Sequence, residues 1–166
     1  MTYQTPESRS TAVEAVLDAL DGIETAILTT HINADGDGIG SEVALAAWLR
    51  ARGTEAHIVN PTLVPQSLRF VVPDESWVVN PSAPETRELC DGADVVLVLD
   101  TGEAPRIGRV KPLIDGITTI VVDHHPPGDQ PIEGVSFRDP TACATGELVF
   151  DIILRAGGPW PSSAPT

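Results

Sequence analysis

The sequence predicts an α/β fold in which helices cover both faces of a parallel sheet of about five strands. Two observations lead to this prediction. Helix-like and strand-like segments alternate along the chain, and the clearest strands are apolar on both faces, as in VVLVL at residues 95–99 and TTIVV at 118–122. Central strands of a parallel sheet need this continuous pattern because helices cover both of their faces. The length of 166 residues suits one domain.

The first half of the chain contains two helix–strand pairs. Thr11 and Glu14 have the spacing of a capping box, and the apolar residues after them recur at the period of an amphipathic helix that ends near Gly22. Further elements follow in order: a buried strand at 25–30, a polar glycine-rich loop at 31–40, a helix at 41–52 and a strand at 55–60.

The second half begins with a stretch in which prolines recur between residues 61 and 84, which indicates short elements and turns. The elements expected beyond it are a strand at 94–99, a loop with a short helix at 104–114, strands at 118–122 and 135–138, and a helix at 146–156. We therefore predict one domain over residues 1–156 and a disordered tail, rich in proline and serine, over 157–166.

Charge and composition restrict the class of binding partner and the cellular compartment that the sequence suggests. The chain has 10 Lys and Arg against 24 Asp and Glu, a net charge of −14, which disfavours binding to long duplex nucleic acid. No apolar run approaches the roughly 20 residues of a membrane span, and no secretory signal is visible. Cys90 and Cys143 lack metal-type spacing and are expected to be free thiols. These features favour a cytoplasmic protein with no membrane partner.

Ionisable side chains directly follow three of the predicted strands. His31, Asp35 and Asp37 share the first loop, Asp100 follows the second apolar run, and the sequence Asp-His-His at 123–125 follows the third. Because the carboxyl ends of parallel strands meet at one edge of the sheet, we expect these side chains to converge there. Imidazoles and carboxylates in such a group suit a divalent metal such as Mn²⁺.

Each loop taken alone also has a plainer interpretation. The first is compatible with an Asp/Gly turn without a ligand, Asp100 with a helix N-cap, and the histidine pair with a solvated surface. An EF-hand and a dinucleotide fingerprint fit the first loop poorly, because neither spacing is present. Taken together, three carboxylates in one crevice need compensating cations. Two divalent ions would supply them, as in centres that hydrolyse phosphoesters. The candidate ligands are His31, Asp35, Asp37, Asp100 and His124.

These residues resemble the motifs of the DHH phosphoesterase superfamily. The first motif, H-x-x-x-D-x-D-x-x-G-S, is matched at residues 31–41, the second is an Asp after a hydrophobic strand, matched by Asp100, and Asp-His-His stands at 123–125. The segment at 139–153 is similar to the oligoribonuclease/pAp-phosphatase (nanoRNase) branch. The resemblance runs from about residue 12 to 156 and implies a Rossmann-like DHH domain.

The resemblance implies a Mn²⁺-dependent phosphohydrolase, with Mg²⁺ or Co²⁺ as alternative ions. It assigns metal ligation to the five candidates above, with Asp37 or Asp100 shared by two ions. His125 is then expected to contact the scissile phosphate and Asp123 to orient an imidazole. The implied substrates are very short RNA, 3′,5′-bisphosphonucleotides such as pAp, and linear or cyclic dinucleotides. A homodimer is an open alternative for the assembly.

The chain also departs from the family pattern. A fourth motif, with an Asp in a D-T-G-like context, and a basic, glycine-rich substrate-binding domain are both expected further along, and neither is in this sequence. The sequence therefore indicates a truncated DHH domain, either poorly active or a non-catalytic remnant that folds and binds metal or a partner. A third hypothesis, a plain nucleotide-binding Rossmann domain, predicts cofactor binding without metal.

Overall fold

A computed structural model describes residues 3–160 and contains one five-stranded, fully parallel sheet. The predicted α/β class is confirmed. The strands lie in the order β2-β1-β3-β4-β5. Their bounds are Thr25–Thr29 for β1, Glu55–Ile58 for β2, Val95–Leu99 for β3, Thr118–Asp123 for β4 and Val135–Arg138 for β5.

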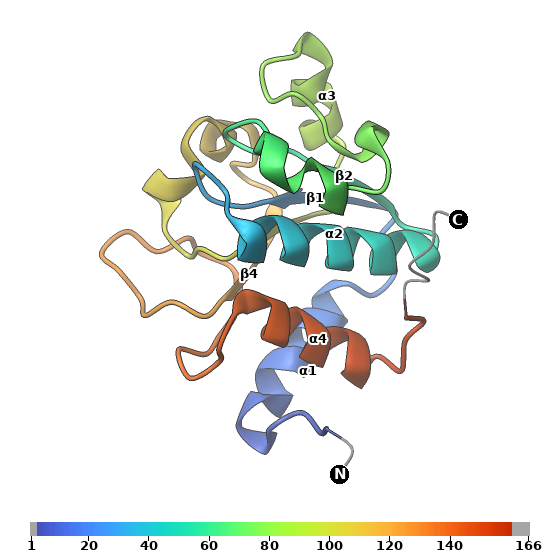
Figure 1. Cartoon of the computed structure of the whole chain (residues 1–166), viewed down its shortest axis with the longest axis vertical. Helices are drawn as coiled ribbons and strands as arrows, with labels where there is room; N and C mark the ends of the chain where they lie inside the picture. Colours follow the sequence, from blue (N-terminus) through green and yellow to red (C-terminus); the bar gives the residue numbers. More distant parts are fainter. Residues whose placement is uncertain (1–2, 161–166) are drawn as a thin grey trace.

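Helical elements cover both faces of this sheet. The α-helices are α1 (Ser10–Ala19), α2 (Gly36–Ala51), α3 (Pro84–Asp91) and α4 (Thr145–Arg155). The 3-10 helices are η1 (Glu7–Arg9), η2 (Gln66–Val71), η3 (Glu75–Trp77) and η4 (Ala104–Leu113). Helices α1, α2 and α4 pack on one face, and α3 and η4 pack on the other. Figure 1 shows α2 and α4 running side by side in front of the strands.

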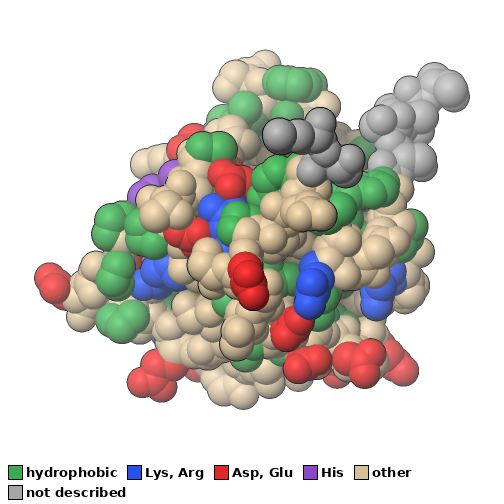
Figure 2. Space-filling view, turned by 90° about the horizontal axis from the view of Figure 1, so that it is seen from below, with side chains coloured by type: hydrophobic (Ala, Val, Ile, Leu, Met, Phe, Trp, Pro, Cys, Tyr) green, Lys and Arg blue, Asp and Glu red, His purple; other side chains and the backbone are tan. Residues whose placement is uncertain are grey.

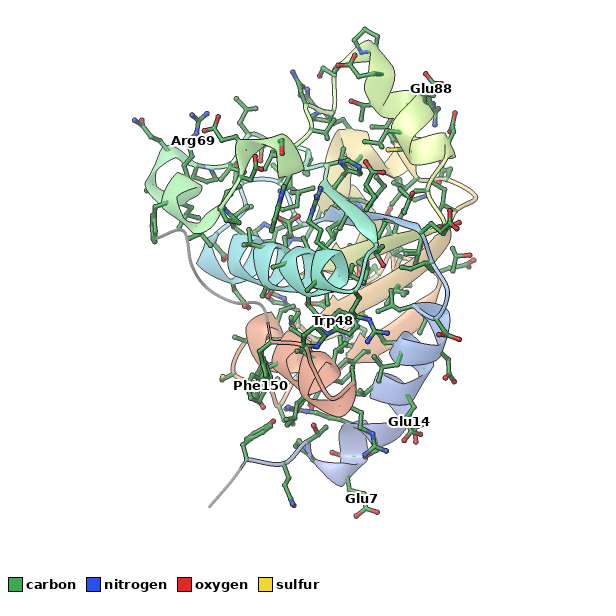
Figure 3. All side chains as sticks on the ribbon, turned by 90° about the vertical axis from the view of Figure 1, so that its right-hand side faces the viewer. Glu7, Glu14, Trp48, Arg69, Glu88 and Phe150 are labelled. Atoms are coloured by element: carbon green, nitrogen blue, oxygen red, sulfur yellow. The ribbon has the colours of Figure 1, made fainter. Side chains whose placement is uncertain are left out.

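The alternation of side chains along β3 explains its unbroken apolar sequence. Val95, Leu97 and Leu99 belong to the core under α1, α2 and α4, whereas Val96 and Val98 belong to the core under α3 and η4. Trp48 of α2 fills the space between α2 and α4 (Figure 3) and is 1% exposed. Both faces of the central strand are therefore buried, as the apolar run predicts.

The start of α2 differs from the sequence prediction. The glycine-rich segment was expected to be a loop through residue 40, but the helix begins at Gly36. The Asp35 side chain accepts hydrogen bonds from the backbone N–H groups of Asp37 and Gly38. This N-cap supplies partners for the first turn and outweighs the low helix propensity of three glycines.

Other boundaries differ as well. The capping box predicted at Thr11 is wrong, because η1 leads directly into α1 and the N-cap residue is Arg9, which makes no side-chain cap. Helix α3 was not predicted; it begins at Pro84, where the fixed backbone angle of proline suits a first helical residue. The predicted tail is irregular at 157–160, and its remainder, 161–166, lies outside the described residues.

The strand order creates a crevice at the carboxyl edge of the sheet. The chain leaves β1 toward β2 on one side, whereas β3 leads to β4 on the other. The loops after β1 and β3 therefore diverge, which is the point where open α/β sheets bind ligands. Within residues 3–160, no helix is long and apolar enough to cross a bilayer.

Candidate metal centre

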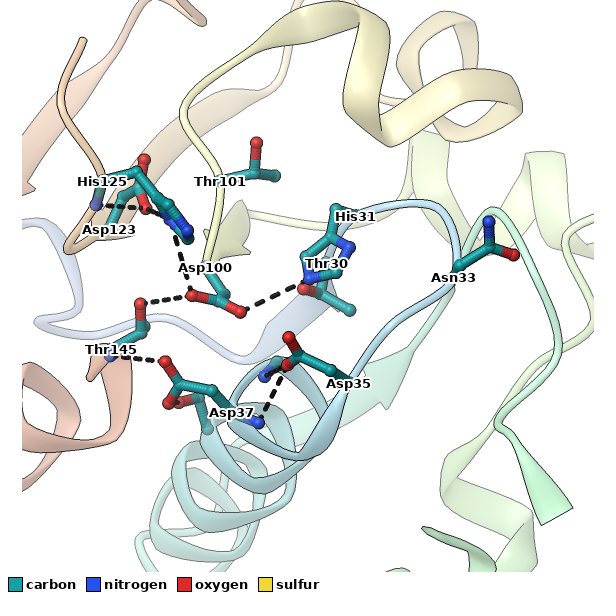
Figure 4. A network of polar contacts seen from close by, with 12 residues as sticks. Thr30, His31, Asn33, Asp35, Asp37, Asp100, Thr101, Asp123, His125 and Thr145 are labelled. Carbon is teal, nitrogen blue, oxygen red and sulfur yellow. Dashed lines mark hydrogen bonds and ion pairs between the residues drawn. The ribbon is translucent and has the colours of Figure 1, made fainter. Parts of the chain in front are cut away.

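The candidate ligands and the Asp-His-His segment lie at this carboxyl edge, and Figure 4 labels all of them except His124, which contacts Asp37 and Asp100. His31 follows β1, Asp100 follows β3, and the Asp-His-His segment spans the end of β4 and the residues after it. Asp35 and Asp37 lie at the cap and in the first turn of α2. Residues up to 94 positions apart in the sequence thus face one another.

Asp100 is at the centre of the cluster and is 1% exposed. Its Oδ2 lies 3.4 Å from Nε2 of His31, and its Oδ1 lies 3.6 Å from Nε2 of His124. The hydroxyl of Thr145 donates to the same Oδ1 at 2.9 Å. The backbone of Asp100 has a φ of 62°, a conformation that is uncommon for residues other than glycine and costs free energy. This conformation brings the carboxylate between the two imidazoles.

Two groups of potential ligand atoms share Asp100. One consists of His31, Asp35 and Asp100, and the other of Asp100, His124 and His125; the atoms of each group lie within 4.8 Å of one another. In the second group, Nδ1 of His125 already lies 2.8 Å from Oδ1 of Asp123, whereas Nε2 of His124 faces Asp100 at 3.6 Å. A carboxylate shared by two groups is compatible with two neighbouring divalent ions.

The imidazoles of His31 and His124 each contact a backbone carbonyl through Nδ1 and face Asp100 through Nε2. Nδ1 of His31 lies 2.9 Å from the carbonyl oxygen of Ile32, and Nδ1 of His124 lies 3.4 Å from that of Ala142. A carbonyl only accepts, so the tautomer with the proton on Nδ1 satisfies both contacts and directs Nε2 toward Asp100. Metal-binding histidines are commonly oriented in this way. The donor set therefore fits a divalent metal.

Asp37 occupies a different position from the other carboxylates. Its Oδ2 accepts from the backbone N–H of Thr145 at 2.8 Å, and its Oδ1 from that of Gly146 at 2.9 Å. The side chain thus binds the positive N-terminus of α4. Asp37 belongs to neither ligand group, although its Oδ2 lies 3.6 Å from Nε2 of His124. Its role as a metal ligand stays a prediction.

The site carries a large excess of negative charge. Burial raises the pKa of Asp100, and the neighbouring charges of Asp37 and Asp35 raise it further, while the Thr145 hydrogen bond acts in the opposite direction. The site carboxylates also include Asp123. Among the described residues, the one arginine or lysine within 4.0 Å of any of them is Arg138, whose Nε lies 3.7 Å from Oδ2 of Asp123. Buried carboxylates with so few neighbouring basic side chains are compatible with a bound cation.

Comparison with known proteins agrees with this geometry. The pattern of the DHH family, N-terminal domain, matches residues 25–163. The chain belongs to the DHH family. The matched range includes all three loops of the site, so the DHH domain and the ligand cluster coincide.

The chain is similar to two curated bacterial proteins. The chain is 33% identical over 156 residues to the bifunctional oligoribonuclease and PAP phosphatase NrnA of Thermus thermophilus. It is 27% identical over 145 residues to a probable protein of the same name from Streptococcus mutans. These alignments cover 93% and 87% of the chain but 43% of each relative. The DHH domain thus spans less than half the length of these relatives.

Solved structures share the fold. An exopolyphosphatase-related protein from Bacteroides fragilis superposes with a TM-score of 0.79 at 24% identity, over 89% of this chain and 44% of that one. A structure of the exonuclease RecJ bound to manganese superposes with a TM-score of 0.57 at 22% identity, over 97% of this chain and 41% of that one. At these identities the likeness shows the fold alone.

Sequence reasoning missed a buried polar chain beneath the DHH site. The carboxylate of Glu42 accepts from the amide of Asn60 at 2.8 Å, and the Asn60 carbonyl accepts from the backbone N–H of Thr30 at 3.0 Å. These hydrogen bonds hold the backbone of Thr30, the residue that precedes His31. Glu42 is fully buried in α2. A glutamate among the apolar residues of a helix was the one signal in the sequence.

We expect Glu42 to make the stability of the DHH domain decrease with pH. Burial raises the pKa of Glu42 from 4.5 to about 8, the Asn60 hydrogen bond lowers it, and the charge of Asp100 raises it. Between these pH values the folded chain keeps a proton that the unfolded chain has lost, so the free energy of unfolding falls as pH rises.

Denaturant unfolding of the wild type and of Glu42→Gln, in EDTA at pH 5 and pH 8, measures this effect. Glutamine keeps the acceptor for Asn60 and does not titrate. Between pH 5 and pH 8, we expect the free energy of unfolding of the wild type to fall by up to roughly 4 kcal/mol more than that of the variant. Parallel pH profiles would show that Glu42 is ionised in the folded chain.

Proposed function

We propose that this chain holds two Mn²⁺ ions and hydrolyses phosphoesters in short oligoribonucleotides, pAp-type nucleotides and linear or cyclic dinucleotides. The observation that carries the proposal is the position of Asp100, which is shared by the two groups of ligand atoms. Support for the substrate class comes from the relatives, which are named as oligoribonuclease and PAP phosphatase. Mg²⁺ and Co²⁺ are the alternative ions.

The two proposed metal positions share Asp100 and differ in their other ligands. His31, Asp35 and Asp100 would hold one ion; Asp100 and His124 would hold the other, with Asp37 adjacent. Bound divalent ions supply a nucleophilic water at neutral pH and compensate the charge of the phosphate. The ligand set consists of imidazole and carboxylate groups without thiolate, which suits Mn²⁺.

The neighbouring pair Asp123 and His125 handles the substrate. Oδ1 of Asp123 accepts from both the backbone N–H of His125 at 3.0 Å and its Nδ1 at 2.8 Å. These two contacts fix the ring and leave Nε2 for the phosphate. The His125 side chain is 41% exposed, more than that of His124 at 24%. Exposure of this ring supports contact with substrate rather than burial behind the metal.

The surface around the site favours small substrates. Histidine atoms reach the surface at one edge of the molecule in Figure 2, and acidic side chains are spread over the same view. The net charge is −14, which repels long polyanions. A short nucleotide presents few phosphates and can be held by the metals alone. A cytoplasmic location and a homodimer are part of the same proposal.

Hydrolysis of pAp and pApA by the purified chain, with Mn²⁺ and with EDTA, tests the function. Calorimetric titration with Mn²⁺ is measured on the same samples. We expect metal binding together with Mn²⁺-dependent release of phosphate or AMP. Binding without turnover would identify a non-catalytic, metal-binding domain, and NAD binding in EDTA would favour a plain nucleotide-binding domain. Absence of Mn²⁺ binding at millimolar metal would reject the centre itself.

A further inference from the structure

We propose that Arg138 is a positioning residue of this site, which holds the Asp123 carboxylate so that Asp123 can orient His125. The inference rests on the proposed function for the role of His125. It names a residue outside the three loops, at the carboxyl end of the edge strand β5.

The register of the sheet brings Arg138 to the site. Strand β5 pairs with β4 in parallel, and Arg138 is the register partner of Asp123. Partners in adjacent strands project from the same face of the sheet. Nε of Arg138 accordingly lies 3.7 Å from Oδ2 of Asp123. The arginine therefore contacts the oxygen of Asp123 that His125 does not use.

The two oxygens of Asp123 are divided between different partners. Oδ1 receives both hydrogen bonds from His125, and Oδ2 faces Arg138. Rotation of this carboxylate would break the hydrogen bonds at Oδ1 and weaken the 3.7 Å charge contact at Oδ2. Asp123 is only 2% exposed, so water provides little alternative. This division transmits the position of Arg138 to the His125 ring.

Gly102 makes room for the guanidinium. A Cβ atom at position 102 would lie 1.5 Å from Nη2 of Arg138 and 2.6 Å from its Cζ. The arginine thus lies directly over the backbone of the loop that begins with Asp100. Its side chain is 15% exposed, and its buried Nε has no hydrogen-bond partner among the described residues. The attraction to Asp123 is what offsets this burial.

A second alternative, direct contact of Arg138 with substrate, makes a different prediction. If Arg138 acts through Asp123, its replacement has little effect once Asp123 is changed. If it contacts substrate, the two effects add. A double-mutant cycle of Arg138→Gln and Asp123→Asn separates the two cases. Arg87→Gln, at a residue whose side chain is 54% exposed and paired with Asp91, is the matched control.

The first readout is nuclear magnetic resonance of ¹⁵N-histidine-labelled protein with Mg²⁺, a diamagnetic ion. In the wild type and in Arg87→Gln, we expect the Nδ1–H proton of His125 to be protected from exchange with solvent by its hydrogen bond to Asp123. Arg138→Gln should lose this protection, and Arg138→Lys, which keeps the charge without the planar fork, should retain part of it. An unchanged His125 signal in a folded Arg138→Gln protein would overturn the proposal.

The second readout is the kinetics of pAp hydrolysis in saturating Mn²⁺. We expect Arg138→Gln to lower kcat about tenfold while Mn²⁺ affinity changes less than about threefold. In the Asp123→Asn background the same substitution should change kcat less than about twofold. A raised KM that persists in that background would assign Arg138 to the substrate instead. If the wild type proves inactive, the proposed function fails and the resonance experiment still decides the positioning role.

Discussion

Replacing Asp100 with asparagine is expected to lower Mn²⁺ affinity by about a hundredfold or more and to abolish measurable hydrolysis. Loss of an outer contact to a metal ligand already costs roughly 10–100-fold in affinity. Asp100 faces both groups of ligand atoms, so its replacement weakens both metal positions at once. Asparagine has nearly the same size and keeps an oxygen for the Thr145 hydroxyl, which bonds to Oδ1. The effect therefore reports charge and ligation rather than packing.

Asp94→Asn is the matched control for this experiment. Asp94 precedes β3 at the amino end, where its carboxylate accepts from the backbone N–H groups of Glu24 and Thr25, whereas Asp100 follows the same strand at the carboxyl end. Calorimetric titration with Mn²⁺ and the rise in melting temperature on adding Mn²⁺ measure the effect. We expect Asp94→Asn to bind like the wild type. Equal affinities for the Asp94 and Asp100 variants would place the metal elsewhere.

Replacing His125 with alanine is expected to separate metal binding from turnover. Loss of one donor that stabilises developing charge costs roughly 10²–10³-fold, so we expect kcat for pAp to fall by about that factor. Mn²⁺ affinity should stay within about threefold of the wild type, because Nδ1 of His125 is held by Asp123 at 2.8 Å and is not available to a metal.

His124→Ala gives the contrast on the neighbouring residue. Its Nε2 lies 3.6 Å from both Asp37 and Asp100, so its loss should reduce Mn²⁺ affinity and activity together. Both variants are measured by titration with Mn²⁺ and by titration with a phosphate analogue in saturating metal. If His125→Ala binds the analogue as the wild type does, the assignment of His125 to the phosphate is wrong. If it loses Mn²⁺, the two histidines have exchanged roles.

Much of the fold could be predicted because its signals are local. A strand covered on both faces must be apolar along its length, as all of β3 and the Ile120–Val122 part of β4 are in sequence and in structure. The glycine-rich start of α2 was mispredicted because the deciding contact, the Asp35 cap, competes with the low helix propensity of glycine. The proline-rich segment before β3 contains a helix whose first residue is itself a proline.

The residue pattern of the chain predicts which imidazole and carboxylate groups gather and at which edge of the sheet. Parallel strands place their carboxyl ends together, so loops that follow apolar runs must share that edge. Only the tertiary structure shows which partner each carboxylate oxygen of the site contacts. Asp37 binds the start of α4, 108 residues away, and Arg138 lies over Gly102. Such contacts depend on strand register and helix placement, which arise from packing of the whole core and leave no local pattern in the chain.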